Sequence, residues 1–159
     1  MIARERPMTA ANEDRITNVV ELSAPPARVW EAITDFKEFG AWFLVDLDQP
    51  FEVGGRSTGQ MTYPGSEGAQ WLAFVEHMEH ERLFSFRWYD TEDLEFDEPT
   101  GRPAMLVEFQ LEETPQGTRL TIAESGFLNL PISRRIELMR GNREGWDIQA
   151  KNLAHYLAS

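Results

Sequence analysis

The sequence contains no cysteine among its 159 residues. This absence excludes a disulfide framework, a thiolate metal site and a thiol nucleophile. The chain also lacks an apolar run of the roughly 20 residues needed to span a bilayer, and no early apolar stretch is typical of a signal peptide. We therefore expect a cytoplasmic protein without membrane insertion.

Basic residues are scarce. The chain has 15 Lys and Arg residues against 27 Asp and Glu residues, which gives a formal net charge of −12. Binding to nucleic acid requires a basic patch that neutralises phosphates, and anionic membrane surfaces attract basic segments for the same reason. The charge therefore argues against both partners, and we interpret it as a contribution to solubility.

Histidine is also rare, and His77, His80 and His155 are scattered without the spacing of metal ligands. The pair Gly54-Gly55 precedes no helical pattern, so it predicts a turn and not a phosphate-binding loop. Ser125 lies in "ESGF", which is not a nucleophile elbow. We expect neither a metal nor a cofactor.

The length fits one domain. Residues 1–14 are polar and predict a flexible N-terminal leader, and residues 15–159 predict a single domain. Within that domain, residues 90–103 are acidic and contain two prolines. We expect them to form a long exposed loop.

A strand-to-helix corner is predicted near the start of the domain. Residues 15–22 are rich in β-branched side chains and predict a strand. Ser23 is the expected N-cap of the following helix, and Pro25 and Pro26 suit its first turn. We expect Trp30 to lie in the core. A second short helix is predicted to begin at Asp35.

The rest of the chain predicts alternating strands, followed by one long helix from Pro131 onward. Gly141 and Gly145 interrupt this helical pattern, each at a cost of roughly 1 kcal/mol relative to Ala, so we expect a bend or a close backbone contact there. This order predicts an α+β fold. Its curved antiparallel sheet of about six to seven strands wraps around the C-terminal helix, with two short helices after the first strand.

Several short stretches resemble one known superfamily. They are "VWEAIT", "AWF", "GGR", "ERLFSFRW", "GTRLTIAESGF" and "EGW" with "NLAHYL", and together they extend over nearly the whole chain. In this order and spacing they resemble the SRPBCC (START-like, helix-grip) superfamily, and within it the heat-shock-protein-90 ATPase activator homologue-like group. The resemblance implies a helix-grip fold that holds apolar small molecules between sheet and helix. Some members of the superfamily are cyclases or hydratases.

A cavity between the sheet and the last helix is the expected site. Aromatic and apolar side chains are either core or lining in such folds, and we expect several to be both. The residues predicted to line the site are Trp42, Phe43, Trp71, Phe86, Trp88, Phe109, Glu124, Phe127, Met139, Arg143 and Trp146.

Glu124 is the first candidate for chemistry. If Leu120 and Ile122 face inward, strand alternation points Glu124 inward too, where desolvation raises the pKa of a carboxyl group. The resemblance implies that family members often have His at this position. Arg143 lies on the apolar stripe of the last helix, so we hypothesise a Glu124–Arg143 pair in the cavity. The alternatives are a purely structural Glu124 and a solvated Arg143.

Three functions remain open at this point. We favour a binding domain for an apolar or amphipathic small molecule, because nothing in the sequence requires catalysis. The second is a cyclase or hydratase with Glu124 as general acid/base and Arg143 as the anion-binding group. The third is a domain that contacts a chaperone or another protein, a partner that the sequence permits but does not indicate. The chain is expected to be a monomer or a dimer.

Overall fold

The computed structural model describes residues 14–89 and 104–159. The expected leader at residues 1–14, apart from Asp14, and the expected loop at residues 90–103 lie outside the described residues. The elements in chain order are β1 (Arg15–Leu22), α1 (Pro26–Thr34), α2 (Phe36–Phe43), β2 (Val45–Leu47), β3 (Arg56–Met61), β4 (Gln70–Glu79), β5 (Leu83–Tyr89), β6 (Ala104–Thr114), β7 (Gly117–Ser125), a short 3-10 helix η1 (Phe127–Asn129) and α3 (Ile132–Ala158).

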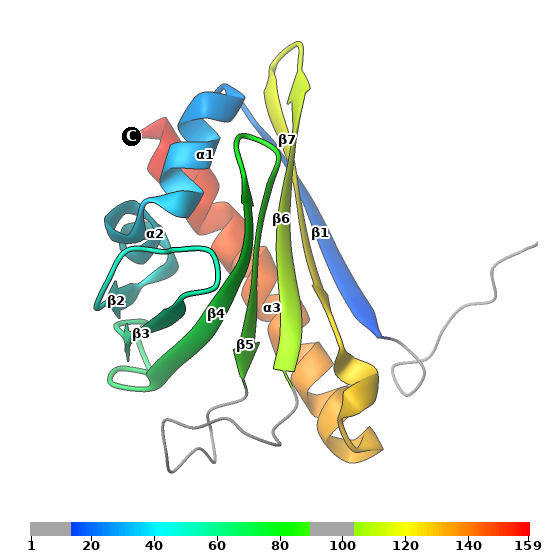
Figure 1. Cartoon of the computed structure of the whole chain (residues 1–159). Helices are drawn as coiled ribbons and strands as arrows, with labels where there is room; N and C mark the ends of the chain where they lie inside the picture. The colour runs from blue at the N-terminus through cyan, green and yellow to red at the C-terminus, as the bar shows by residue number, and fades with distance from the viewer. Residues whose placement is uncertain (1–13, 90–103) are drawn as a thin grey trace, which may run out of the picture.

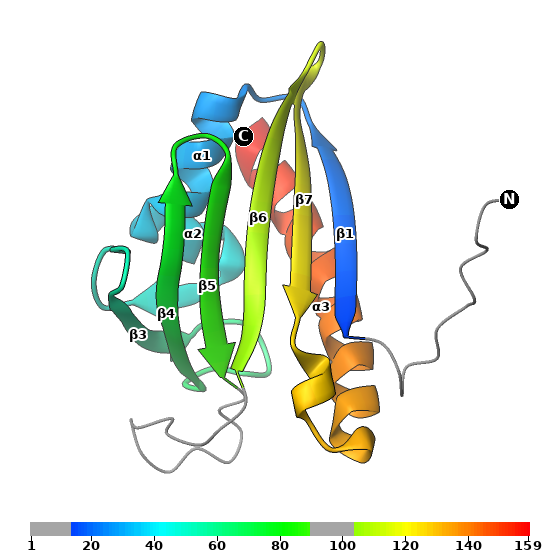
Figure 2. The same ribbon diagram turned by 45° about the vertical axis from the view of Figure 1, so that its right-hand side comes forward.

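The seven strands form one antiparallel sheet in the order β1-β7-β6-β5-β4-β3-β2. The first strand pairs with the last, and Ile16 is the register partner of Glu124. All three α-helices lie on one face of this curved sheet (Figures 1 and 2). The predicted helix-grip fold is therefore confirmed: sheet, two short helices and a long C-terminal helix occur in the expected order.

Strand alternation sorts the sheet residues between its two faces. In β6, Met105, Val107 and Phe109 are buried on the helix side, and polar Glu108 lies between Val107 and Phe109 in the sequence. The following turn places Gly117 at φ +147°, a backbone conformation that side chains rarely adopt. After this turn, β7 pairs antiparallel with β6, and Gly117 is the register partner of Thr114.

The corner after β1 differs in detail from the prediction. Helix α1 begins at Pro26, and its N-cap is Pro25 instead of the expected Ser23. Trp30 is only partly buried and meets His80 edge-on, at 5.9 Å between ring centroids. The fully buried residues of this helix are Val29, Ala32 and Ile33. Trp30 was expected in the core, but the row of α1 that faces the sheet carries the smaller side chains, and Trp30 packs against the core from a partly buried position.

Helix α2 is fixed at both ends. Asp35 accepts hydrogen bonds from the backbone N–H groups of Lys37 and Glu38, and this side-chain cap begins the helix at the residue where the sequence predicted its start. At the other end, Leu44 adopts the left-handed conformation with φ 68°. From the last turn, Trp42 donates its indole N–H to the backbone carbonyl of Ala32 at 2.9 Å, which ties α2 to α1.

Helix α3 is continuous over 27 residues. The expectation of a close backbone contact at its glycines is wrong, because a Cβ atom at Gly141 or Gly145 would meet nothing within 4 Å. Its buried side chains include Met139, Trp146 and Leu153, three members of the predicted apolar stripe. No helix among the described residues is both long and apolar enough to cross a membrane.

Aromatic rings fill the space between α2 and the sheet. Phe39 is fully buried at the centre of this cluster and has stacked, tilted or edge-to-face contacts with six other rings. Those six rings are Trp42, Phe43, Phe51, Trp71, Phe86 and Phe109. The space between α2 and this part of the sheet is therefore filled by aromatic side chains.

Candidate functional site

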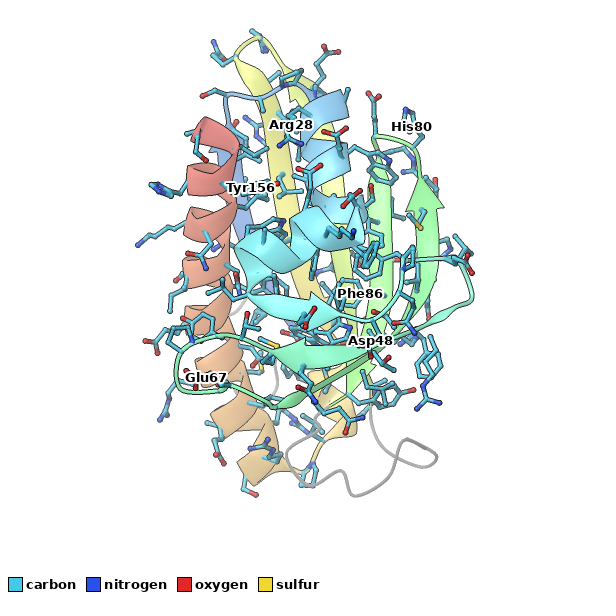
Figure 3. The ribbon with its side chains drawn as sticks, turned by 90° about the vertical axis from the view of Figure 1, so that its left-hand side faces the viewer. Arg28, Asp48, Glu67, His80, Phe86 and Tyr156 are labelled. Atoms are coloured by element: carbon cyan, nitrogen blue, oxygen red, sulfur yellow. The ribbon has the colours of Figure 1, made fainter. Side chains whose placement is uncertain are left out.

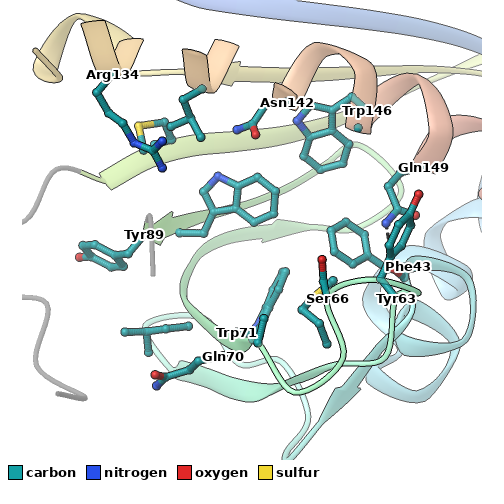
Figure 4. A pocket seen from close by; sticks show the side chains of 17 residues that line it. Phe43, Tyr63, Ser66, Gln70, Trp71, Tyr89, Arg134, Asn142, Trp146 and Gln149 are labelled. Carbon is teal, nitrogen blue, oxygen red and sulfur yellow. Dashed lines mark hydrogen bonds between the residues drawn. The ribbon is translucent and has the colours of Figure 1, made fainter. Parts of the chain in front are cut away.

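A pocket of about 500 Å³ opens between α3 and the β3–β5 side of the sheet (Figure 4). This volume lies within the range of small-molecule sites. Residues between β3 and β4, such as Ser66 and Ala69, are exposed and form part of its rim. The lining residues are Phe43, Met61, Tyr63, Ser66, Ala69, Gln70, Trp71, Leu72, Trp88, Tyr89, Met105, Arg134, Leu138, Asn142, Gly145, Trp146 and Gln149.

Four aromatic rings form the inner wall of the pocket. Trp88 from β5 and Trp146 from α3 are stacked, with ring centroids 5.4 Å apart and planes inclined by 25°. Trp71 from β4 meets Trp88 edge-to-face at 5.8 Å, and Phe43 from α2 meets Trp71 in the same way at 5.5 Å. The wall therefore joins α2, the sheet and α3 through direct ring contacts.

The indole N–H groups of this wall are all used inside the protein. Trp71 donates to the hydroxyl of Ser57 at 2.9 Å. Trp88 and Trp146 donate to the carboxylate of Glu124, at 2.7 Å and 3.0 Å. Because their polar atoms have partners elsewhere, the three tryptophans present carbon and π surface to the pocket.

Glu124 is fully buried on β7, on the same face of the sheet as Leu120 and Ile122. The amide nitrogen of Asn142 lies 3.0 Å and 3.1 Å from its two oxygens, so Asn142 joins the two indoles as a third donor residue. Both carboxylate oxygens therefore accept hydrogen bonds from neutral N–H groups. Three residues that line the pocket are therefore hydrogen-bonded to the buried carboxylate of Glu124, which lies behind them: Trp88, Asn142 and Trp146.

Two opposing effects act on this carboxyl group. Burial raises the pKa of Glu124 above its ordinary value, because desolvation disfavours the charged form. The hydrogen bonds from Trp146, Trp88 and Asn142 lower the pKa, since each N–H donor favours the charged form. Burial is the larger effect, so the net pKa is raised.

The hypothesised pair between Glu124 and Arg143 is corrected by this arrangement. Arg143 is exposed and lines a separate, very small pocket with Ile16, Asn18 and other residues. The hydrogen-bond donors that act on the pKa of Glu124 are the two indoles and Asn142, and Arg143 is not among them. The apolar stripe of α3 predicted that Arg143 lies near the cavity. The pocket is instead lined by an adjacent face of α3, which carries Leu138 and Asn142.

The predicted lining residues fall into two groups in the structure. Phe43, Trp71, Trp88 and Trp146 line the pocket. The others lie in the core, behind the wall or in the small pocket: Trp42, Phe86, Phe109, Phe127, Met139, Glu124 and Arg143. Size and apolarity alone therefore do not separate a lining ring from a core ring.

Sequence reasoning missed most of the α3 contribution. The pocket face of α3 carries Arg134, Leu138, Asn142, Gly145 and Gln149, at successive spacings of three or four residues. That spacing is helical, but the row mixes charged, apolar, amide and glycine residues. A search for apolar periodicity selects the adjacent core row and passes over this one.

Acidic side chains are absent from the described lining of the pocket, and Arg134 is its one charged residue. Arg134 lies in the first turn of α3, and its Nη1 is 3.4 Å from Glu137, whose side chain is 74% exposed. Among the residues in 14–89 and 104–159, no group of three His, Asp or Glu side chains is placed to hold a metal ion.

Comparisons with known proteins agree with the fold. A family model described as "Activator of Hsp90 ATPase homolog 1-like protein" matches residues 23–158. A comparison with curated protein sequences gives no match. The structure is similar to protein MLL2253 from Mesorhizobium loti, with 26% identity, a TM-score of 0.72, and coverage of 91% of this chain and 96% of that chain.

Two further structures complete the comparison. DynU16, a putative protein in the dynemicin biosynthetic locus, is 26% identical with a TM-score of 0.71 over 92% of this chain, which spans only 48% of DynU16. The Aha1 dimer from Colwellia psychrerythraea is 16% identical with a TM-score of 0.67, covering 88% of this chain and 92% of that one, a likeness of fold alone. The family model covers most of the chain, and the chain therefore belongs to the Activator of Hsp90 ATPase homolog 1-like family, within the SRPBCC superfamily.

Proposed function

We propose that this chain binds an apolar or amphipathic small molecule in the pocket between α3 and the sheet. The observation that carries the proposal is the wall formed by Phe43, Trp71, Trp88 and Trp146 around a volume of about 500 Å³. Apolar walls with a few polar groups are typical of small-molecule sites. Family and fold support a ligand-binding domain, and one relative, DynU16, is a putative protein in a biosynthetic locus.

Catalysis by Glu124 is not part of this proposal. A general acid or base has to come within hydrogen-bond reach of the substrate. Glu124 is fully buried behind the wall, and both its oxygens accept hydrogen bonds from residues that separate it from the pocket. Its geometry fits a residue that holds the tryptophans in place.

The test is a ligand screen with a pocket-filling variant. Native mass spectrometry and thermal shift are measured against fatty acids, flavonoids, sterols and fused-ring phenols. A ligand at one hundred times its dissociation constant adds about 2.7 kcal/mol of stability. Leu138→Trp places a large side chain on the pocket face of α3 and is expected to abolish the shift.

The matched control is Ile148→Trp, because Ile148 lies on the same helix and is exposed. This variant should bind the ligand as the wild type does. Binding that survives in Leu138→Trp, or that is lost equally in both variants, would contradict the pocket as the binding site. A screen in which no small molecule binds the wild type would contradict the proposed function itself.

A further inference from the structure

Most polar atoms beside the aromatic wall are already engaged within the protein. The three indole N–H groups of the wall have protein acceptors. The amide of Gln149 is engaged at both ends, because its nitrogen donates to the backbone carbonyl of Phe43 at 2.8 Å and its oxygen accepts from Asn152 at 3.1 Å. A ligand on the wall therefore depends on the few polar atoms that remain open.

Asn142 has such an atom. Its amide nitrogen lies 3.0 Å and 3.1 Å from the two oxygens of Glu124, whereas its amide oxygen Oδ1 accepts no hydrogen bond from the part of the chain that the structure describes. The side chain is half-buried and lines the pocket. Figure 4 shows it projecting from α3 between Arg134 and Trp146. A partly buried carbonyl oxygen without a donor gains a hydrogen bond when a ligand supplies one.

The orientation of this amide follows from the chemistry of its partner. An ionised carboxylate only accepts hydrogen bonds, so the end of Asn142 that faces Glu124 has to be the NH₂ group. Each carboxylate oxygen also accepts one indole N–H, from Trp88 on one side and from Trp146 on the other. All three partners of Glu124 are thus donors, which is the arrangement that suits the ionised acid. The carbonyl end of Asn142 is thereby turned away from Glu124.

Resting on the proposed function, we propose that the ligand is a ring compound with a hydroxyl or N–H group: its ring packs on Trp88 and Trp146, and its hydroxyl or N–H donates to Oδ1 of Asn142. Trp146 follows Asn142 by one turn of α3, about 6 Å along the helix axis, so one small molecule can reach both. Asn142 is then the residue that determines specificity. Because its other end is held by Glu124, the buried acid decides which hydrogen-bonding group the pocket offers.

A proton on Glu124 reverses that offer. A neutral carboxyl group has an O–H that needs an acceptor, and Asn142 provides one when its amide turns over. The NH₂ group of Asn142 then faces the pocket and suits a ligand carbonyl instead of a ligand hydroxyl. Burial raises the pKa of Glu124, so this exchange is expected above the ordinary titration range of a carboxyl group.

Glu124 is the titrating group at this place. Its register partners are Ile16 on β1 and Val107 on β6, and its partner on β5 is Trp88, none of which titrates. On α3 the charged residues beside Asn142 and Trp146 lie outside the pocket: exposed Glu144, and Arg143 and Asp147 in the separate small pocket. Arg134, which lines the main pocket, keeps its charge at every pH used in the experiment below.

The test uses three uncharged probes with one ring system: 2-naphthol carries a hydroxyl donor, 2-acetylnaphthalene carries only an acceptor, and 2-ethylnaphthalene carries neither. Each probe is titrated at about pH 8 against the tryptophan fluorescence of the wild type and of Asn142→Leu. A phenolic hydroxyl titrates near pH 10, so 2-naphthol keeps its proton. Since each probe is hydrated identically in both titrations, the ratio of its two dissociation constants measures what Asn142 contributes.

Asn142→Leu is expected to weaken binding of 2-naphthol about fivefold, and binding of the other two probes less than about twofold. When the pH is lowered from about 8 to about 5.5, Glu124 gains its proton, and the wild type should come to bind 2-acetylnaphthalene about threefold more tightly than the variant does. The control is Arg140→Leu, which places the same side chain at an exposed position of the same helix and should change none of the three affinities.

The outcomes distinguish this inference from the proposed function. If Asn142→Leu weakens 2-naphthol and 2-ethylnaphthalene equally, or weakens neither, the contact assigned to Asn142 is overturned, while binding of the rings to the wild type upholds the pocket. A ratio for 2-acetylnaphthalene that does not change with pH would overturn the part assigned to Glu124. If none of the three probes binds the wild type, nor any larger ring compound, the proposed function fails and the inference with it.

Discussion

Trp88 and Trp146 lie stacked at 5.4 Å between ring centroids, and both donate their indole N–H to the same carboxylate, that of Glu124. One ring comes from the sheet and the other from α3. A buried acid therefore links the two layers of the fold at the wall of the pocket. Packing alone would allow such rings to slide, but a shared acceptor fixes their relative orientation.

The first prediction concerns pH. Burial raises the pKa of Glu124, so the folded protein binds this proton more tightly than the unfolded chain does. The corresponding stability is fully present below the unfolded pKa and is lost as the pH rises through the folded pKa. In Glu124→Gln this dependence is absent, since Gln does not titrate. We expect the unfolding free energy of the wild type, relative to Glu124→Gln, to fall from about pH 4 upward.

Urea denaturation across a pH series measures this difference. The amide of Gln also presents N–H groups to the N–H donors of the wall, which adds a penalty that does not vary with pH. Glu112→Gln is the control for the loss of one carboxylate, because Glu112 is 68% exposed. A wild-type advantage that grows with pH would contradict the raised pKa.

The second prediction compares two glycines. A Cβ at Gly117 would lie 2.3 Å from the carbonyl oxygen of Leu22, at a φ of +147°. Gly117→Ala should therefore destabilise the protein by at least about 2 kcal/mol. Gly141 lies inside α3 with open space around its Cβ position, so Gly141→Ala should stabilise by about 0.5–1 kcal/mol. Chemical denaturation of both variants tests the pair, and the same sign for both would contradict it.

The third prediction concerns the start of α2. Asp35 accepts hydrogen bonds from the N–H groups of Lys37 and Glu38, at 2.9 Å and 3.0 Å. Asp35→Ala leaves both donors without this partner and should cost about 1 kcal/mol, whereas Asp35→Ser should recover most of that loss. Thermal unfolding measures both variants. Equal stability of Asp35→Ala and Asp35→Ser would show that the cap contributes nothing.

The fourth prediction concerns the end of α3. Tyr156 donates its hydroxyl to Glu38 at 2.7 Å, and Arg28 donates to the same oxygen at 2.7 Å. Figure 3 labels Arg28 on α1 and Tyr156 on α3. This cluster joins α3 to α1 and α2. Tyr156→Phe should cost about 1 kcal/mol, and a double-mutant cycle with Glu38→Ala isolates the pairwise energy. A coupling energy of zero would mean that this hydrogen bond does not help to hold the end of α3 against α1 and α2.

The sequence was sufficient for the fold because its signals are periodic and local. Strand alternation predicted that Phe109 and Leu120 face inward, and Asp35 marked the start of α2 through a side chain that caps its own helix. Such features depend on neighbours two to four residues away. They predict which residues are buried, and they do so without knowledge of the sheet order.

The site was predicted only in part, for a physical reason. Phe109 and Trp146 are both large, aromatic and buried, and only the contacts of Trp146 with Glu124 and with the pocket distinguish them. Arg134 and Gln149 carry no apolar signal, so periodicity could not identify them as lining residues. The three donors to Glu124 are Trp88 from β5 and Asn142 and Trp146 from successive turns of α3. They are brought together only by the tertiary fold, so no local sequence pattern predicts the contact.

The pairing of β1 with β7 has a consequence for how the chain folds as it is synthesised. Among the seven described strands, Arg15–Leu22 is synthesised before the other six, and its hydrogen-bonding partner, Gly117–Ser125, is synthesised after all of them. Until then β1 has no neighbouring strand, and the sheet cannot be completed from its N-terminal side. Such non-local pairing is slow to form. The earliest strand to be translated is therefore among the last to gain its native hydrogen bonds.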